Sequence, residues 1–273
     1  MDITMRYECS LSPPMLARAI AELNEPDNNL DRLKAIDRLK VNFDVEKYGP
    51  LLKEDDAFIL RFLRARKFDQ RKALKLLQKY HTIRTELPEV FNRVKEPERL
   101  AAIMNSGTLY FSNGRTKTGS WVLMFKPGPM NDIISAYDVV AYSVLCIEKL
   151  LENEEYQICG SITIDDLKDF NLTSLSNLPS SKLKKMFDLW QDSMPIRIMP
   201  IHILNESKVF SALFKLIQPF MKKKIKQKLR LHGNCFAELH DSVEKHLLPS
   251  CLGGTGPDPV EASAIWLQQL SEM

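Results

Sequence analysis

The chain has 273 residues, of which 44% are hydrophobic and 27% charged, and its formal net charge is +3. This composition is typical of a globular protein of one or two domains. Five cysteines without a Cys-x-x-Cys pair argue against a disulfide scaffold. No window approaches the roughly 18 consecutive apolar residues of a membrane span, and the first ten residues lack the features of a signal peptide. We therefore expect a cytoplasmic protein.

The first third of the chain has the hydrophobic spacing of helices. Apolar residues recur at three-residue steps from Leu30 to Leu39, which predicts an amphipathic helix. Asp55 precedes a second apolar stripe and Asp69 a third, and both carboxylates stand where a helix N-cap is expected. These elements predict a small helical domain over residues 14–93, after a tail of residues 1–13.

Beyond Leu100 the pattern changes to short apolar runs that alternate with helical spacing. Strands are predicted at residues 107–111, 121–126, 159–164 and 197–204, and helices at 138–151 and 183–190. Pro200 restricts how the fourth strand can be paired. This alternation predicts an α/β domain over residues 100–258, followed by a tail of residues 259–273.

The residues that usually carry catalysis form no convincing site. The stretch Gly253-Gly254-Thr255-Gly256 lacks the Lys-Ser/Thr of a phosphate-binding loop, so a plain turn is expected. Five histidines have no metal-ligand spacing. Asp165 and Asp166 follow a strand, where a magnesium site would be one alternative, but without a phosphate loop we expect a solvated strand end. We predict no metal, no cofactor and no enzymatic activity.

The most informative segment runs from Ser207 to His232. Its apolar residues fall on one helical face from Phe210 to Met221, and six of the nine residues from Lys222 to Arg230 are cations. An ordinary core-facing helix is one interpretation, and a basic amphipathic helix at an anionic membrane surface is the other. The segment around these cations has no aromatic residue to stack on bases, which disfavours nucleic acid as the partner.

Four separated motifs resemble the CRAL-TRIO lipid-binding family, including the alpha-tocopherol transfer proteins and the cellular retinaldehyde-binding proteins. The resemblance covers about residues 14–258. The motifs are Phe62-Leu-Arg-Ala-Arg-Lys-Phe68, Ile201-His-Ile-Leu-Asn205, Gln218-Pro-Phe-Met221 with the following Lys224-Ile-Lys226 and His232-Gly233, and the ending from Leu248-Pro249 to Gly253-Gly254.

This resemblance implies an N-terminal helical domain and an α/β domain whose apolar pocket holds one tocopherol-, retinoid- or phospholipid-like ligand beneath a mobile lid helix. Ile147 stands where the tocopherol-binding members place a serine, Ser161 where they carry an aliphatic residue, and Phe170 where they carry a tryptophan, which argues against tocopherol itself. The implied ligand contacts are Val140, Ser143, Val144, Ile147, Phe170, Met186, Leu189, Trp190, Met194, Ile196 and Ile198, with Phe210, Leu213, Ile217 and Met221 from the lid.

The resemblance also implies a cleft for phosphoinositides. Arg197, Lys224 and Lys228 match three of its cationic positions, and Met199 stands at the fourth. The full expected set is Arg197, Lys222, Lys223, Lys224, Lys226, Lys228 and Arg230. We therefore expect a lipid-transfer protein that exchanges its ligand during transient contact with phosphoinositide-containing membranes. The alternative is a phosphoinositide-reading adaptor without cargo, and the sequence gives no indication of oligomeric state.

Overall fold

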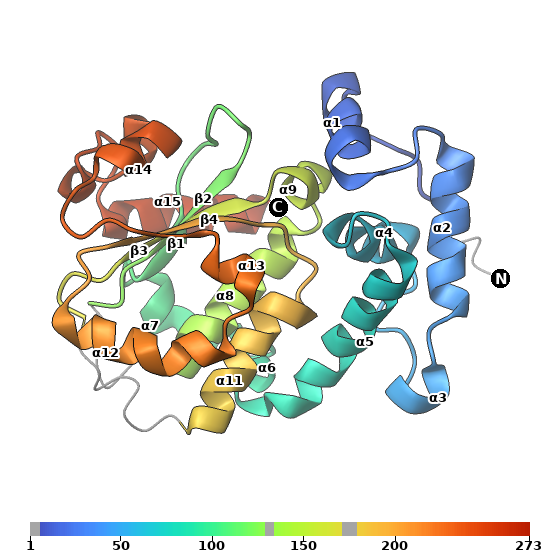
Figure 1. Cartoon of the computed structure of the whole chain (residues 1–273), viewed down its shortest axis with the longest axis horizontal. Coiled ribbons are helices and arrows are strands. Elements are labelled where there is room, and N and C mark those ends of the chain that lie inside the picture. Colours follow the sequence, from blue (N-terminus) through green and yellow to red (C-terminus); the bar gives the residue numbers. More distant parts are fainter. Residues whose placement is uncertain (1–5, 129–133, 171–178) are drawn as a thin grey trace. The chain divides into compact units, whose positions relative to one another are not determined.

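A computed structural model describes residues 6–128, 134–170 and 179–273 (Figure 1). The chain divides into two compact units. The first contains the chain up to Glu86, together with Leu150–Ile158 and Asp188–Arg197, and the second contains Leu87–Lys149, Cys159–Phe187 and the chain from Ile198 onward. The first unit therefore takes two short segments from within the predicted α/β region.

Helices build the first unit, as the sequence predicted. Asp55 accepts a hydrogen bond from the amide of Phe58 at 2.7 Å, and Asp69 accepts one from the amide of Lys72 at 3.0 Å, which confirms both predicted caps. Between them Phe68 has a φ of 57°, a left-handed conformation that ends one helix before the next begins. The helices are α1 (Pro13–Leu23), α2 (Asn29–Val41), α3 (Val45–Tyr48), α4 (Asp56–Ala65), α5 (Gln70–Glu86), α9 (Glu154–Cys159) and the π-helical turn η2 (Leu189–Ser193).

A buried ionic network connects helices of this unit, and it includes an arginine of the sequence motif Phe62–Phe68. Arg64, from the Phe-Leu-Arg-Ala-Arg motif, and Arg32 each bring a guanidinium Nε to 2.8 Å from a different carboxylate oxygen of Glu25. Arg64 also lies 2.9 Å from a carboxylate oxygen of Glu154. Glu25, Arg32 and Arg64 are at most 2% exposed. Removing one partner would leave buried charge uncompensated, which typically costs about 3–5 kcal/mol.

The second unit is built on a five-stranded sheet in the order β1-β2-β3-β4-β5. Strand β1 (Leu109–Phe111) is antiparallel to β2 (Trp121–Phe125), and β3 (Ser161–Asp166), β4 (Ile198–Leu204) and β5 (Leu229–Leu231) continue in parallel. The first four confirm the predicted strands, and β5 was not predicted. The helices are α6 (Pro88–Val94), η1 (Pro97–Leu100), α7 (Ala101–Met104), α8 (Ala136–Leu150), α11 (Ser180–Asp188), α12 (Lys208–Ile217), η3 (Gln218–Phe220), α13 (Lys223–Lys226), α14 (Ala237–Ser242), η4 (Lys245–Leu247), η5 (Ser250–Leu252) and α15 (Pro259–Glu272).

Pro200 lies inside β4, between two neighbouring strands. The register of β4 against β3 shifts between the pairs Ser161–Ile198 and Thr163–Ile201, so the proline falls in an irregular stretch of the ladder. A bulge is where a residue without an amide N–H can be accommodated in a sheet. The predicted restriction on pairing is thus met by a local change of register.

The segment 259–273, predicted as a tail, contains α15. Asp258 caps this helix by accepting hydrogen bonds from two backbone amides. Trp266 is 1% exposed, its ring centroid lies 4.8 Å from that of Phe111 on β1, and its indole N–H donates to the Cys146 thiol at 3.4 Å. The C-terminal helix therefore contributes to the core of the α/β unit.

The predicted helix over residues 210–221 is shorter in the structure, because α12 ends at Ile217. A 3-10 turn that contains Pro219 follows, then the single-turn helix α13, and then β5. Proline has no amide N–H to continue an α-helical ladder, which explains the change of geometry. The cations from Lys222 onward therefore lie on α13 and β5 or directly beside them, and not on a continuation of α12, which ends before α13 (Figure 1).

Candidate functional site

One face of the sheet in the second unit is covered by α12. Ser207 caps this helix by accepting a hydrogen bond from the amide of Phe210 at 3.3 Å. Phe210 points onto the sheet, where it forms a buried cluster with Ile203 of β4 and Leu167. Phe170, Ile201, Phe214 and Leu229 pack against this cluster and remain partly accessible. The helix thus contacts β4 and β5 through an apolar layer that is rich in phenylalanine.

The structure places the predicted ligand contacts in both units. In the second unit, Phe170 and Phe210 share the cluster under α12, Met221 is buried and Ile217 is partly buried, whereas the side chain of Leu213 lies outside the described part. Ser143 donates its hydroxyl to the carbonyl of Val139 at 2.8 Å, so this hydroxyl is satisfied within α8. The remaining contacts of this unit are Val140, Val144 and Ile147 on α8, Met186 on α11 and Ile198 on β4. Leu189, Trp190, Met194 and Ile196 belong to the first unit.

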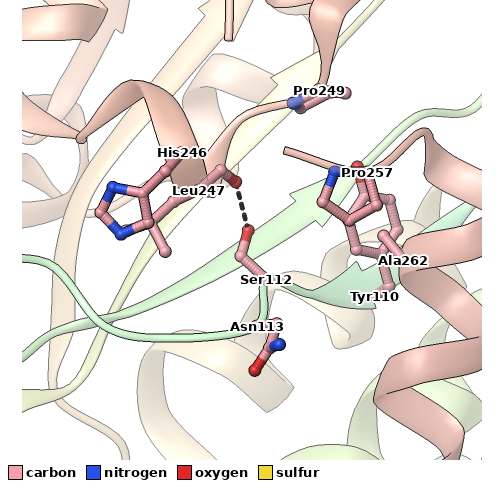
Figure 2. Close-up of a pocket in the computed structure, with 8 residues that line it drawn as sticks. All are labelled: Tyr110, Ser112, Asn113, His246, Leu247, Pro249, Pro257 and Ala262. Atoms are coloured by element: carbon pink, nitrogen blue, oxygen red, sulfur yellow. Dashed lines mark hydrogen bonds between the residues drawn. The ribbon is translucent and has the colours of Figure 1, made fainter. Parts of the chain in front are cut away.

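A small pocket in the second unit contains none of the predicted ligand contacts. Figure 2 shows its lining, where Ser112 donates a hydrogen bond to the Leu247 carbonyl at 2.8 Å. Its free space holds at most about one water molecule, far below what a lipid needs. The pocket is lined by Tyr110, Ser112, Asn113, His246, Leu247, Pro249, Pro257 and Ala262.

The basic segment after α12 lies at the surface. Ile225 is buried and anchors α13, while the lysines on either side of it are exposed. Leu231, at the end of β5, is 53% exposed. The segment therefore presents cations next to an exposed apolar side chain. Its exposed cations are Lys222, Lys223, Lys224, Lys226 and Arg230, and Lys228 is partly buried.

Arg197, the remaining predicted phosphoinositide contact, belongs to the first unit and already has partners there. Its guanidinium donates to the carboxylate of Glu22, and also to the carbonyl of Ile158 at 2.6 Å. Burial works to raise the pKa of Glu22, but the hydrogen bonds and charges of Arg197 and Arg18 together outweigh it and hold that pKa below its usual range. A phosphate would have to compete with Glu22 for this guanidinium, so the role of Arg197 remains a prediction.

The expectation of a solvated strand end at Asp165 and Asp166 is wrong for Asp166. Asp166 is 2% exposed, and its carboxylate accepts hydrogen bonds from the Asn205 amide at 2.6 Å and from the backbone of Lys168 at 3.1 Å. Asp165 is partly buried on the opposite face of β3, and burial raises its pKa to about 7. The alternation of polar and apolar residues along Ser161–Asp166 is the sequence signal that separates the two carboxyls.

A pair of histidines links β4 to the end of β5. Nδ1 of His202 lies 2.9 Å from Nε2 of His232, and the two rings stack with their centroids 5.1 Å apart. Burial lowers the pKa of His202 to about 4, and the charges of His232 and Arg230 act in the same direction. His202 is therefore neutral at physiological pH. Glu238 lies 3.6 Å from Nδ1 of His232, but among the described residues no group of three or more His, Cys, Asp or Glu side chains could hold a metal ion.

Among residues 6–128, 134–170 and 179–273, no helix is both long and apolar enough to cross a bilayer.

Comparisons with known proteins identify the family. Residues 105–254 match the CRAL/TRIO domain, and residues 34–79 match the CRAL/TRIO N-terminal domain. The mouse protein "Alpha-tocopherol transfer protein-like" is 37% identical over 263 residues, which covers 94% of this chain and 74% of that protein. Clavesin-1 of Xenopus laevis is 34% identical over 251 residues, covering 90% of this chain and 74% of that protein.

Among solved structures, the crystal structure of Sfh5 matches 97% of this chain and 100% of its own, with 14% identity and a TM-score of 0.49. The family assignment comes from the sequence matches, since the CRAL/TRIO domain match spans more than half of the 273 residues. The α/β unit and the helices before it are the two parts that these matches cover. This chain belongs to the CRAL/TRIO family.

Proposed function

We propose that this protein is a lipid-transfer protein that holds one small hydrophobic ligand against the sheet face covered by α12 and exchanges it at phosphoinositide-containing membranes. CRAL/TRIO proteins are lipid-binding and transfer proteins, and one relative is named for alpha-tocopherol transfer. The observation that carries the proposal is an apolar helix packed on the sheet through Phe210 and Phe214, followed directly by an exposed basic segment.

The energetics favour opening at a membrane over opening in water. Exposing a large apolar side chain to water costs about 1.5–3 kcal/mol, so lifting Phe210 and Phe214 together costs about 3–6 kcal/mol. Acyl chains of a bilayer would replace the contacts with Ile203 and Leu167. We infer that α12 is the lid and that it stays closed in solution.

The basic segment supplies the attraction that brings this lid to the bilayer. Each lysine or arginine close to an anionic membrane contributes about 1 kcal/mol. Lys222 and Lys223 are exposed and follow α12 by only a few residues, so cations and lid would reach the surface together. Leu231 could insert beside them.

The ligand contacts inferred from the sequence stay part of this proposal. Val140, Val144 and Ile147 lie on one helix, α8, at the three- and four-residue spacing that aligns side chains on one face. Their mixture of buried and partly buried side chains is compatible with an apolar wall. No chemistry beyond apolar contact is required of them.

Transfer of a fluorescent phospholipid between vesicles tests the lid. Phe210→Asp and Ile217→Asp should reduce ligand retention and change the transfer rate about tenfold or more, because Phe210→Asp places a carboxylate in the apolar layer and Ile217→Asp places one at a partly buried position of the same helix. Ser211→Asp is the matched control, since Ser211 is exposed on the same helix. If all three variants retain and transfer lipid like the unchanged protein, α12 is not the lid. Recruitment to phosphoinositide vesicles by a protein that never takes up lipid would favour the adaptor.

A further inference from the structure

The loop after β1 contains the sequence Asn113-Gly114, which is the single Asn-Gly pair in the chain. An asparagine side chain can react with the backbone nitrogen of the next residue to form a five-membered cyclic imide. A side chain on that next residue hinders the approach of the two groups, and glycine has none. Both residues are exposed, and Gly114 has a φ of 115°, in the region that favours glycine. The pair is therefore accessible to solvent and sterically open to this reaction.

The nucleophile of this reaction is the backbone nitrogen of Gly114. It must lose its proton to attack, and a hydrogen bond to a carbonyl would hold that proton in place. Among the described residues the N–H of Gly114 has no hydrogen-bond partner. Asn42 and Asn105 are also exposed, but there the N–H of the next residue is engaged. It donates to the carbonyl of Lys40 at 3.1 Å in the first case and to that of Ile103 at 3.2 Å in the second. Hydrogen bonding therefore protects these two asparagines and leaves the Asn-Gly pair reactive.

The electrophile is the side-chain amide carbon of Asn113. Its Oδ1 accepts a hydrogen bond from Nε2 of Gln269 on α15 at 2.7 Å. This donor withdraws electron density from the carbonyl and stabilises the negative charge that develops on the oxygen during attack. The NH2 group, which must leave, has no hydrogen bond within the part of the chain that the structure describes, whereas those of Asn42 and Asn105 each donate to a carbonyl. The surroundings of Asn113 thus activate the carbonyl carbon without holding the leaving group.

We propose that Asn113 is a modification site, at which the side chain cyclises and is then converted to aspartate and isoaspartate. The nitrogen of Gly114 bonds to Cγ of Asn113, and the bond from Cγ to the amide nitrogen breaks, so that this nitrogen leaves with the proton as ammonia. Water then opens the imide at either of its two carbonyls. Opening at the side-chain carbonyl gives aspartate, and opening at the main-chain carbonyl gives isoaspartate. The overall change consumes one water molecule and releases one ammonia, and it is independent of lipid transfer.

The two products affect the structure differently, because this loop is joined twice to the C-terminal part of the chain. Figure 2 shows Ser112 donating its hydroxyl to the Leu247 carbonyl, and the next residue, Asn113, accepts from Gln269. Aspartate at position 113 keeps an oxygen that can accept from Gln269. Isoaspartate routes the main chain through the side-chain carbon, which lengthens the backbone by one methylene and moves the carboxylate. Isoaspartate therefore breaks the contact with α15, and aspartate does not.

Incubation of the full chain in mildly alkaline buffer at physiological temperature tests the site. Peptide mapping by mass spectrometry should find Asn113 converted at least about tenfold faster than Asn42 and Asn105, which requires a difference in barrier of only about 1.4 kcal/mol. Conversion should slow in mildly acidic buffer, because the Gly114 nitrogen has to lose its proton. Carboxyl methylation by an isoaspartyl methyltransferase identifies the isoaspartate product.

Variants separate the reaction from its structural consequence. Asn113→Gln keeps the amide but would need a six-membered ring, so it should remain unconverted under the same conditions. The isoaspartate form, separated from the aged protein by chromatography, should melt about 2–4 °C below the unchanged protein, the shift typical of one lost hydrogen bond in a chain of this size. Freshly prepared Asn113→Asp is the matched control for the added charge and should melt close to the unchanged protein.

Two outcomes would overturn different parts of this inference. If Asn113 converts no faster than Asn42 and Asn105, or if Asn113→Gln gains mass at the same rate as the unchanged protein, Asn113 is not the site. If isoaspartate forms there but melts together with Asn113→Asp, the modification stands and the contact with Gln269 does not stabilise the protein.

Discussion

Replacing Asp165 with asparagine should change how the stability of the ligand-free protein depends on pH. Burial raises the pKa of this carboxyl from 3.8 to about 7, so the folded protein binds the proton more tightly than the unfolded chain. The contribution of Asp165 to stability is therefore most favourable below about pH 4, decreases as the pH rises to about 7, and is constant above that. The amide that replaces the carboxyl in Asp165→Asn would not titrate.

The magnitude follows from the size of the shift. One pKa unit corresponds to about 1.4 kcal/mol, so a shift from 3.8 to about 7 is worth at most about 4 kcal/mol. His81 and His202 have pKa values lowered to about 4, mainly by burial, and they make stability rise with pH over the same range. Both histidines are present in both proteins, so their effect cancels when the two are compared.

The assay is urea unfolding of the unchanged protein and Asp165→Asn at a series of pH values. The free energy of unfolding of the variant, minus that of the unchanged protein, should increase by a few kcal/mol between about pH 4 and about pH 8. A difference that stays constant over this range would show that Asp165 titrates normally. It would then contradict the burial that raises this pKa.

Three further perturbations test other parts of the structure. Glu25→Gln should lower the free energy of unfolding by about 3–5 kcal/mol in urea titrations, because Arg32 and Arg64 would lose the buried carboxylate that they share. In an NMR titration, the ring signals of His202 should show a midpoint near pH 4, well below the ordinary 6.5. Replacing Lys222 and Lys223 with glutamate should weaken binding to anionic vesicles about tenfold or more in sedimentation assays, and the effect should shrink at high salt.

Each of these has a control or a contradicting outcome. Glu46→Gln changes an exposed glutamate of the same unit and should leave the unfolding free energy nearly unchanged. A His202 midpoint near 6.5 would contradict its burial. The control for Lys222 and Lys223 is the replacement of Lys47 and Lys53 with glutamate. Both lysines are exposed in the first unit, and their replacement changes the net charge by the same amount. If these replacements weaken vesicle binding equally, net charge and not the basic segment controls binding.

Periodicity and capping made the helices and most strands predictable. Asp55 and Asp69 mark helix starts because each caps a backbone amide only three residues further along the chain. The apolar runs of β2 to β4 are long enough to be recognised as strands in the sequence. Strand β5 was missed because its three residues, Leu229–Leu231, are embedded in a run of cations. The early end of α12 follows from Pro219, which the apolar spacing alone conceals.

The candidate site depends on contacts that no local pattern reveals. Arg197 pairs with Glu22, which is 175 residues away in sequence, so its cationic character alone says nothing about its availability. The alternation along Ser161–Asp166 assigns Asp165 and Asp166 to opposite faces of β3, but the sequence does not show that Asn205 provides a hydrogen bond to Asp166. The position of Asp165 beside Ile203 becomes visible only when the register of β3 and β4 is known.

The central claim is that this protein carries one hydrophobic molecule, and native mass spectrometry of the purified full chain tests it most directly. The account predicts a near-stoichiometric complex whose extra mass leaves on solvent extraction and is a single hydrophobic molecule. A ligand-free, folded chain that also takes up no tocopherol, retinoid, phospholipid or long-chain alcohol when these are offered would contradict the account.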